Sequence, residues 1–175
     1  NFALTANENI TGGASIISDQ SSCPFKAFAL NRLKLSPHPA IESGISKTAR
    51  GTAIHIALET LFEKITSDKA LKTISPHQLS EYFTEAAVMA VEFLSKTHRD
   101  LLTPRLKNIE QQRICRLLGK FIELEKERPE FKVVAREETL FFKFENLKLT
   151  LRIDRIDQLE DGSYALIDYK TGKVS

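Results

Sequence analysis

Residues 147–172 of the 175-residue chain read LKLTLRIDRIDQLEDGSYALIDYKTG, and this stretch decides the fold. Apolar and polar residues alternate from Leu147 to Asp154, which is the pattern of a half-buried β-strand. The sequence Glu-Asp-Gly at 160–162 is a turn signal, and Ser163–Lys170 has the composition of another strand. The stretch therefore predicts two antiparallel strands joined by a tight turn.

The same stretch brings charged side chains together. Alternation along the second strand places Asp168 and Lys170 on one face, about 7 Å apart. Asp154 and Asp168 are equally far in sequence from residue 161, so they are expected to lie opposite each other. Two such carboxylates repel unless a cation lies between them, and Mg²⁺ accepts carboxylate ligands well. Lys170 has no lone pair for a metal, but it can orient water or stabilise phosphoryl charge. The alternative is an ordinary Asp–Lys pair on a solvated face.

The chain upstream of this stretch is predicted to be mostly helical. Apolar spacing and capping residues predict four helices. The first runs from Asp19 to about Leu33 after a Ser18 cap, with Phe25 and Leu33 on its apolar stripe. The second begins near Thr52, the third begins at Pro76, and the fourth runs from Pro104 to about Arg128. Val133–Phe144 is rich in β-branched and aromatic residues and predicts a further strand. Helices followed by a three-stranded antiparallel meander make an α+β fold.

Three phenylalanines in the first strand allow two interpretations. Phe141, Phe142 and Phe144 can form a base-stacking platform or pack in the core. We expect the core, because consecutive aromatic residues on a meander usually pack against helices. Cys23 and Cys115 are likewise expected to be buried apolar residues.

The composition of the chain argues against a membrane-spanning or a secreted protein. Lys and Arg number 25 and Asp and Glu 23, for a net charge of +2, and no apolar run approaches the roughly 20 residues that span a bilayer. The two cysteines fit a reducing compartment, and no signal peptide is visible, so we expect a cytoplasmic protein. The chain does not begin with Met, and we expect it to be a piece of a longer protein.

Positive charge is concentrated near the N-terminus. Between Gln20 and Arg50 there are five basic residues and one acidic residue. Such a segment is either a solvated face or a binding surface for phosphates. Under the second interpretation, the phosphate-binding residues include Lys26, Arg32, Lys47 and Arg50.

Four segments carry a recognisable pattern: Ile153–Asp157 followed by Ile167–Gly172, the helix Arg50–Glu59 with its Gly-x-x-x-His-x-x-Leu-Glu pattern, the Cys-Pro-Phe segment within Ser22–Phe28, and Arg136–Glu137. Together they resemble the PD-(D/E)XK nuclease superfamily, specifically its RecB-like exonuclease branch, which is related to AddB-type nuclease domains. The resemblance implies one restriction-endonuclease-like core over residues 1–175, incomplete at its C-terminus, with a helical insertion at 71–128. It also implies a metal-dependent exonuclease-like enzyme of DNA repair or recombination that works with a helicase subunit or domain.

The resemblance also implies roles for individual residues. His55, Asp154 and Asp168 would bind Mg²⁺ or Mn²⁺, Lys170 would be catalytic together with Asp154 and Asp168, and Glu137 would be a supporting acid. Glu59 is a second supporting acid, because it lies one helical turn from His55. Some relatives hold an iron–sulfur cluster, but Cys23 alone matches its ligands here, so no cluster is expected within these 175 residues. The alternative is a catalytically silent module that binds DNA or a helicase.

Overall fold

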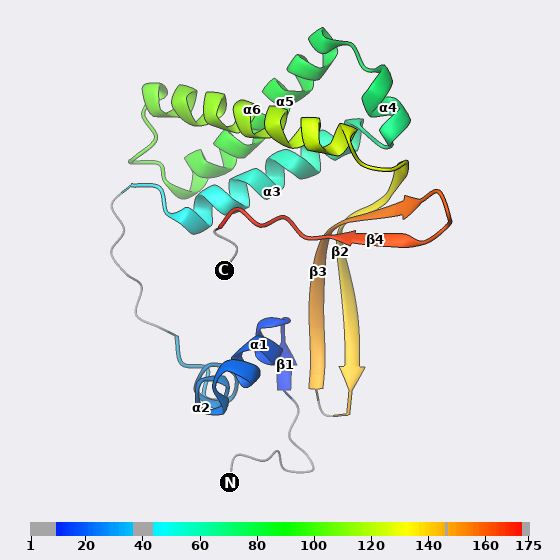
Figure 1. Ribbon diagram of the computed structural model, residues 1–175. Helices are drawn as coiled ribbons and strands as arrows, with labels where there is room; N and C mark the ends of the chain where they lie inside the picture. Colours follow the sequence, from blue (N-terminus) through cyan, green and yellow to red (C-terminus); the bar gives the residue numbers. More distant parts are fainter. Residues whose placement is uncertain (1–9, 37–43, 146, 173–175) are drawn as a thin grey trace. The chain divides into compact units, whose positions relative to one another are not determined.

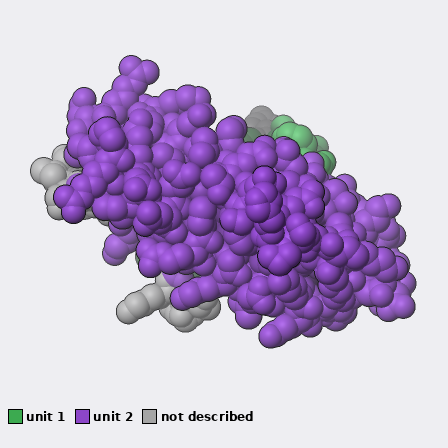
Figure 2. All heavy atoms as spheres, turned by 90° about the horizontal axis from the view of Figure 1, so that it is seen from above, with its two compact units in different colours: residues 1–41, 138–153 green, residues 42–137, 154–175 purple. Residues whose placement is uncertain are grey.

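The computed structural model describes residues 10–36, 44–145 and 147–172 (Figure 1). The chain divides into two compact units, coloured separately in Figure 2: residues 1–41 with 138–153, and residues 42–137 with 154–175. We call them unit 1 and unit 2. Helices precede most of the sheet in sequence, which confirms the predicted α+β class.

The strands form a mixed sheet around β3 (Leu147–Leu159). It pairs with β2 (Phe131–Phe144) and, on its other edge, with the antiparallel β4 (Tyr164–Ile167), as the turn signals predicted. A short strand, β1 (Ile10–Gly12), pairs in parallel with the start of β3 and was not predicted, because three residues show no periodicity. Strand β4 ends three residues earlier than expected, before Asp168.

Four helices build most of unit 2. They are α3 (Lys47–Lys64), α4 (Asp68–Thr73), α5 (Pro76–Thr97) and α6 (Pro104–Lys126). Each begins after a Ser or Thr whose side chain accepts a hydrogen bond from a backbone N–H of the first turn. This N–H has no carbonyl partner within the helix, so the cap stabilises the helix start. The Ser46 cap explains why α3 begins five residues before the predicted Thr52. Helix α4 was not predicted because it is only six residues long.

Small residues let these helices approach closely. Helix α3 packs against both α5 and α6, and α5 packs against α6. Ala53 and Ala57 of α3 and Ala86, Ala87 and Ala90 of α5 are fully buried. Larger buried side chains fill the rest of this core: Leu61, Phe62, Ile114, Leu118 and Ile122. The packed helices hold α3 rigidly, and α3 carries His55.

The helix predicted over residues 19–33 is wrong in its bounds and its buried face. The structure instead has α1 (Ser15–Ser22), α2 (Pro24–Ala27) and a π-helical turn, η1 (Phe28–Arg32). Cys23 breaks the helix with extended backbone angles, because a residue before proline is pushed out of the helical region. The break disrupts the predicted stripe: Phe25 and Leu33 are exposed. Cys23 is exposed too, so its assignment to the core was wrong.

The expectation that the three strand phenylalanines are buried is also wrong. Phe141, Phe142 and Phe144 are 82%, 56% and 63% exposed. Consecutive residues of a strand project to opposite faces, so Phe141 and Phe142 cannot share one packed surface. Cys115 is only half-buried, but it packs against the core, and its thiol donates to the carbonyl of Phe83.

Candidate active site

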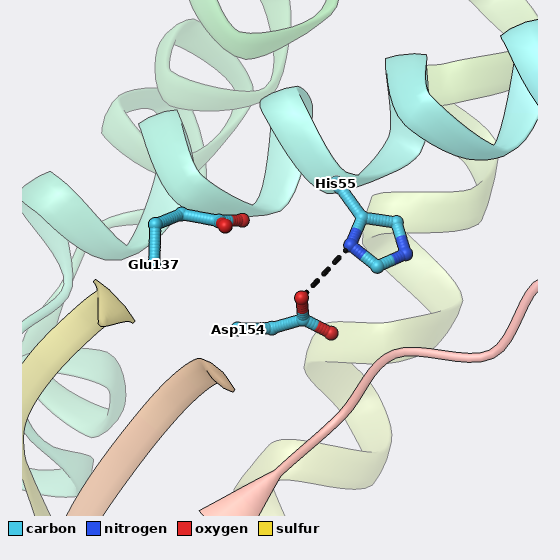
Figure 3. A group of neighbouring side chains, drawn as sticks. All are labelled: His55, Glu137 and Asp154. Carbon is cyan, nitrogen blue, oxygen red and sulfur yellow. Dashed lines mark hydrogen bonds and ion pairs between the residues drawn. The ribbon is translucent and has the colours of Figure 1, made fainter. Parts of the chain in front are cut away.

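Three potential metal ligands from three elements of unit 2 meet at one point (Figure 3). His55 comes from α3, Glu137 from β2 and Asp154 from β3. One ligand atom from each lies within 4.8 Å of the others. The three residues are far apart in sequence, so only the packing of α3 beside these strands assembles the group.

Asp154 is held in place by contacts to both of its carboxylate oxygens. Its carboxylate is 7% exposed, and each oxygen has a partner. Oδ1 lies 3.1 Å from His55 Nδ1, and Oδ2 accepts a hydrogen bond of 2.6 Å from the backbone N–H of Tyr169. These contacts fix the orientation of the carboxylate. A charged group can be buried at low energetic cost only when its atoms have hydrogen-bond partners, as both oxygens have here.

Glu137 reaches the group from a strained backbone. Its φ is 47°, in the left-handed region, which costs a residue with a Cβ about 1–2 kcal/mol. Residues held in this region cluster at functional sites, where surrounding structure maintains them. The unusual conformation directs the carboxylate toward His55 and Asp154 (Figure 3).

The donor set fits a divalent cation. Ligand atoms on an ion lie about 2.0–2.2 Å from it, so opposite ligands are about 4 Å apart, within the spread of this group. Two carboxylates suit Mg²⁺ and Mn²⁺, and an imidazole adds affinity for transition metals. His55, Glu137 and Asp154 can therefore hold a divalent metal ion.

Asp168 and Lys170 lie just past the end of β4. Their side chains are 53% and 70% exposed and form an ion pair of 2.5 Å, and the hydrogen bond that Lys170 donates to Asp168 raises the pKa of Lys170. The predicted alternation continues through this segment, because Tyr169 between them is buried. Arg155 pairs with Ile167, so the register continued by one step sets Asp154 opposite Asp168. Among the described residues, however, Asp168 is not part of the three-residue ligand group.

Tyr169 ties this segment to the interior. Its ring meets those of His55 and Phe121 edge to face, with centroids 5.9 and 5.6 Å away. Its hydroxyl is buried beside the Arg155 guanidinium, without the geometry of a hydrogen bond. Burial raises the pKa of this phenol well above its usual value, so it stays neutral.

Behind Tyr169 lies a buried ionic cluster that sequence reasoning missed. Arg155 and Arg128 share the carboxylates of Glu125 and Asp157, at 2.6–2.9 Å. Two cations and two anions balance, and the Arg155 guanidinium lies 3.9 Å over the ring of Phe62. Burial by itself would lower the pKa of Arg155, but the neighbouring carboxylates of Glu125 and Asp157 outweigh it and raise the pKa. The alternating charges of Arg155 and Asp157, in the motif around Asp154, were the sequence feature that could have indicated this cluster.

A glycine lets the segment after β4 lie close against α3. A Cβ built on Gly51 would be 3.1 Å from Thr171 Oγ1, tighter than ordinary contact. Gly51 is four residues before His55, so the approach occurs one helical turn from the ligand group.

Comparison with known families agrees with this geometry. A model of the PD-(D/E)XK nuclease superfamily matches residues 14–175. The chain belongs to the PD-(D/E)XK nuclease superfamily. Members of this superfamily are typically metal-dependent nucleases, and the His55–Glu137–Asp154 group supplies ligands for a divalent metal. No curated protein matches the chain. Among the described residues, no helix combines the length and apolar character needed to cross a bilayer.

The other predicted site residues of this superfamily member are dispersed. Glu59 lies on α3, one turn beyond His55, outside the ligand group. In unit 1, Lys26 pairs with Asp19 at 2.9 Å and Arg32 lies 5.3 Å from the ring of Phe28. Lys47 and Arg50 belong to unit 2 and lie on the first turns of α3. Their assignment to DNA stays a prediction.

Proposed function

We propose that this chain is the nuclease domain of a RecB-like, exonuclease-like enzyme that hydrolyses phosphodiester bonds of DNA during repair or recombination. The observation that carries the proposal is the group His55, Glu137 and Asp154, assembled next to the Asp168–Lys170 pair in a PD-(D/E)XK chain.

The residues of the site divide the chemical tasks. His55, Glu137 and Asp154 would hold the metal, with Asp168 as a further ligand, and we infer Mg²⁺ or Mn²⁺. When bound, such an ion lowers the pKa of water and polarises a phosphoryl oxygen. Lys170 is a cation at neutral pH, its pair with Asp168 raises its pKa further, and it can stabilise charge on the phosphoryl group. Glu59 would support His55 from the next turn of α3.

The wider context follows from the same resemblance. We infer that the domain belongs to a longer cytoplasmic protein, that residues 71–128 are a helical insertion, and that a helicase subunit or domain presents the DNA. Lys26, Arg32, Lys47 and Arg50 would bind backbone phosphates without reading sequence.

One observation favours the alternative, a silent module that binds DNA or a helicase. Asp168 faces Lys170 and stands apart from the other three ligands among the described residues. An inactive relative would most readily have lost Asp168 or Lys170, however, and this chain retains both, which favours the enzyme.

The deciding experiment is a cleavage assay on the chain and on its longer parent, using end-labelled single- and double-stranded DNA. We expect cleavage with Mg²⁺ or Mn²⁺, none with EDTA, and none in Asp154→Asn. Glu160→Gln, which makes the same change in an exposed turn, is the matched control. DNA binding without metal-dependent cleavage by the parent would identify a silent module.

A further inference from the structure

We infer that a pocket between α3, α6 and the segment after β4 binds an unpaired DNA strand, so that helix α6 supplies part of the substrate site. This inference rests on the proposed function, because it takes DNA as the substrate. It adds Arg113 and Lys120 of α6 to the binding residues and specifies a single strand in place of a duplex.

The pocket is large and lies entirely in unit 2. Its volume is about 770 Å³, within the range of about 300–1,000 Å³ that small-molecule sites occupy. Residues 167–172 form one wall, and α3 and α6 form the others. A pocket of this size takes a strand of separate nucleotides more readily than a rigid duplex.

Cations dominate the charged lining of the pocket. Lys47 and Arg50 of α3, Arg113 and Lys120 of α6 and Lys170 contribute five positive charges, and Asp168 contributes one negative charge. The lining is therefore +4, in a chain whose total charge is +2. Such a concentration of positive charge attracts the phosphates of a nucleic acid.

Two of these cations are held in place by a buried carboxylate. Glu110 is 1% exposed and accepts bonds from Arg50 at 2.6 Å and from Arg113 at 2.7 Å. Two guanidinium groups on one carboxylate leave a net positive charge. Both arginine side chains also line the pocket, so their exposed parts can contact a phosphate there. The arginines are thus pre-positioned for phosphate binding.

The rest of the wall is apolar, and this favours unpaired nucleotides. Leu117 and Leu124 of α6 line the pocket and are 40% and 63% exposed, and Leu58 of α3 lines it too. Paired bases are stacked inside a duplex, whereas an unpaired strand can lay its bases and sugars on apolar side chains while its phosphates contact cations.

The pocket adjoins the ligand group. Ile54 lines it, and His55 is the next residue of α3. Tyr169 also lines it and donates its backbone N–H to Asp154. A strand held by Arg50, Arg113 and Lys120 would therefore continue to the metal ligands.

The test measures binding apart from cleavage. Fluorescence anisotropy in EDTA would compare a labelled 12-nucleotide strand with its duplex, for the wild-type chain and three variants. Lys120→Glu changes the pocket, and Lys107→Glu makes the same change on α6 outside the pocket. Leu124→Ser removes an exposed apolar contact without changing charge. Thermal melts would check that each variant is folded.

We expect the wild-type chain to prefer the single strand. Lys120→Glu should weaken that binding about tenfold and reduce the salt-dependence slope by about 0.7 for each lost phosphate contact. Lys107→Glu should stay within about twofold of wild type, and Leu124→Ser should weaken single-strand binding alone. Equal losses in both charge variants, or equal binding of duplex, would overturn the inference. Pocket-dependent binding without metal-dependent cleavage by the parent would refute the proposed function and leave the pocket assignment standing.

Discussion

The backbone N–H of Tyr169 donates a hydrogen bond of 2.6 Å to Oδ2 of Asp154. This bond joins the PD-(D/E)XK motif across its two halves: Asp154 comes from β3, and Tyr169 lies between Asp168 and Lys170. One carboxylate therefore orients both His55, through Oδ1, and the segment that carries Lys170, through Oδ2. The position of the lysine depends on the same side chain that is proposed to bind the metal.

The replacement Asp154→Asn separates the structural role of this side chain, which is to accept the hydrogen bond from Tyr169, from its proposed role as a metal ligand. An amide oxygen still accepts from Tyr169, so we expect the fold to be retained, but the lost charge should weaken Mn²⁺ binding by at least about tenfold. Isothermal titration calorimetry measures this affinity. Glu160→Gln should bind the metal like wild type, and unchanged affinity in Asp154→Asn would place the metal site elsewhere.

Replacing Glu137 by glycine should have opposite effects on the stability of the protein and on metal binding. Glu137→Gly removes the cost of a positive φ and should maintain or raise the free energy of unfolding, by up to about 1 kcal/mol. It also removes a ligand, so metal affinity should fall. Glu137→Gln keeps the strain and also loses the charge. Denaturant unfolding with calorimetry checks both effects; a clear loss of stability in Glu137→Gly would mean that the carboxylate contributes more to folding than its backbone costs.

The sequence predicted the sheet better than the N-terminal region, for physical reasons. In β3 and β4, alternation and a Glu-Asp-Gly turn fix the register locally, so the antiparallel pairing of the two strands was predicted correctly, and that register continued by one step sets Asp154 opposite Asp168. The break at Cys23 could have been predicted from Pro24, but the pairing of β1 with β3 depends on a contact across more than 130 residues. Glu137 joins the ligand group through a backbone angle that no periodicity encodes.

Tyr169 is predicted to act through its ring and not its hydroxyl. The hydroxyl is buried without a hydrogen bond among the described residues, so Tyr169→Phe should change the free energy of unfolding by less than about 1 kcal/mol and leave cleavage intact. Tyr169→Ala removes the contacts with His55 and Phe121 and should cost about 3–5 kcal/mol. Chemical denaturation compares the two variants; a large loss in Tyr169→Phe would show that the hydroxyl has a partner.

The buried ionic cluster should be sensitive to the loss of one partner. Asp157→Ala leaves Arg155, which is fully buried, with one carboxylate partner, and should destabilise the protein by about 3–5 kcal/mol. Asp161→Ala, in the exposed turn, should cost much less. Thermal denaturation of both variants makes the comparison, and similar melting temperatures would mean that the cluster contributes little.

Lys170 is predicted to act as a fixed cation. Because the hydrogen bond that Lys170 donates to Asp168 raises the pKa of Lys170 above the ordinary 10.5, the ammonium stays protonated below that pH and loses its charge only above it. The rate of DNA cleavage by the parent protein should therefore show no ionisation of Lys170 between pH 6 and 9. Any stabilisation from the exposed ion pair is at most about 1 kcal/mol, is present below pH 10.5 and is lost as the pH rises through the raised pKa.

Replacing this lysine distinguishes a catalytic cation from a surface partner of Asp168. Lys170→Ala should lower the cleavage rate about 10²–10³-fold while metal affinity and DNA affinity stay nearly unchanged, since one contact among several contributes little to binding. Lys170→Arg should restore only part of the rate, because its guanidinium is a larger, rigid fork. Lys132→Ala, an exposed lysine of β2, is the matched control. Normal cleavage by Lys170→Ala would reject the catalytic role, and a parallel loss of binding and cleavage would instead make Lys170 a DNA-binding residue.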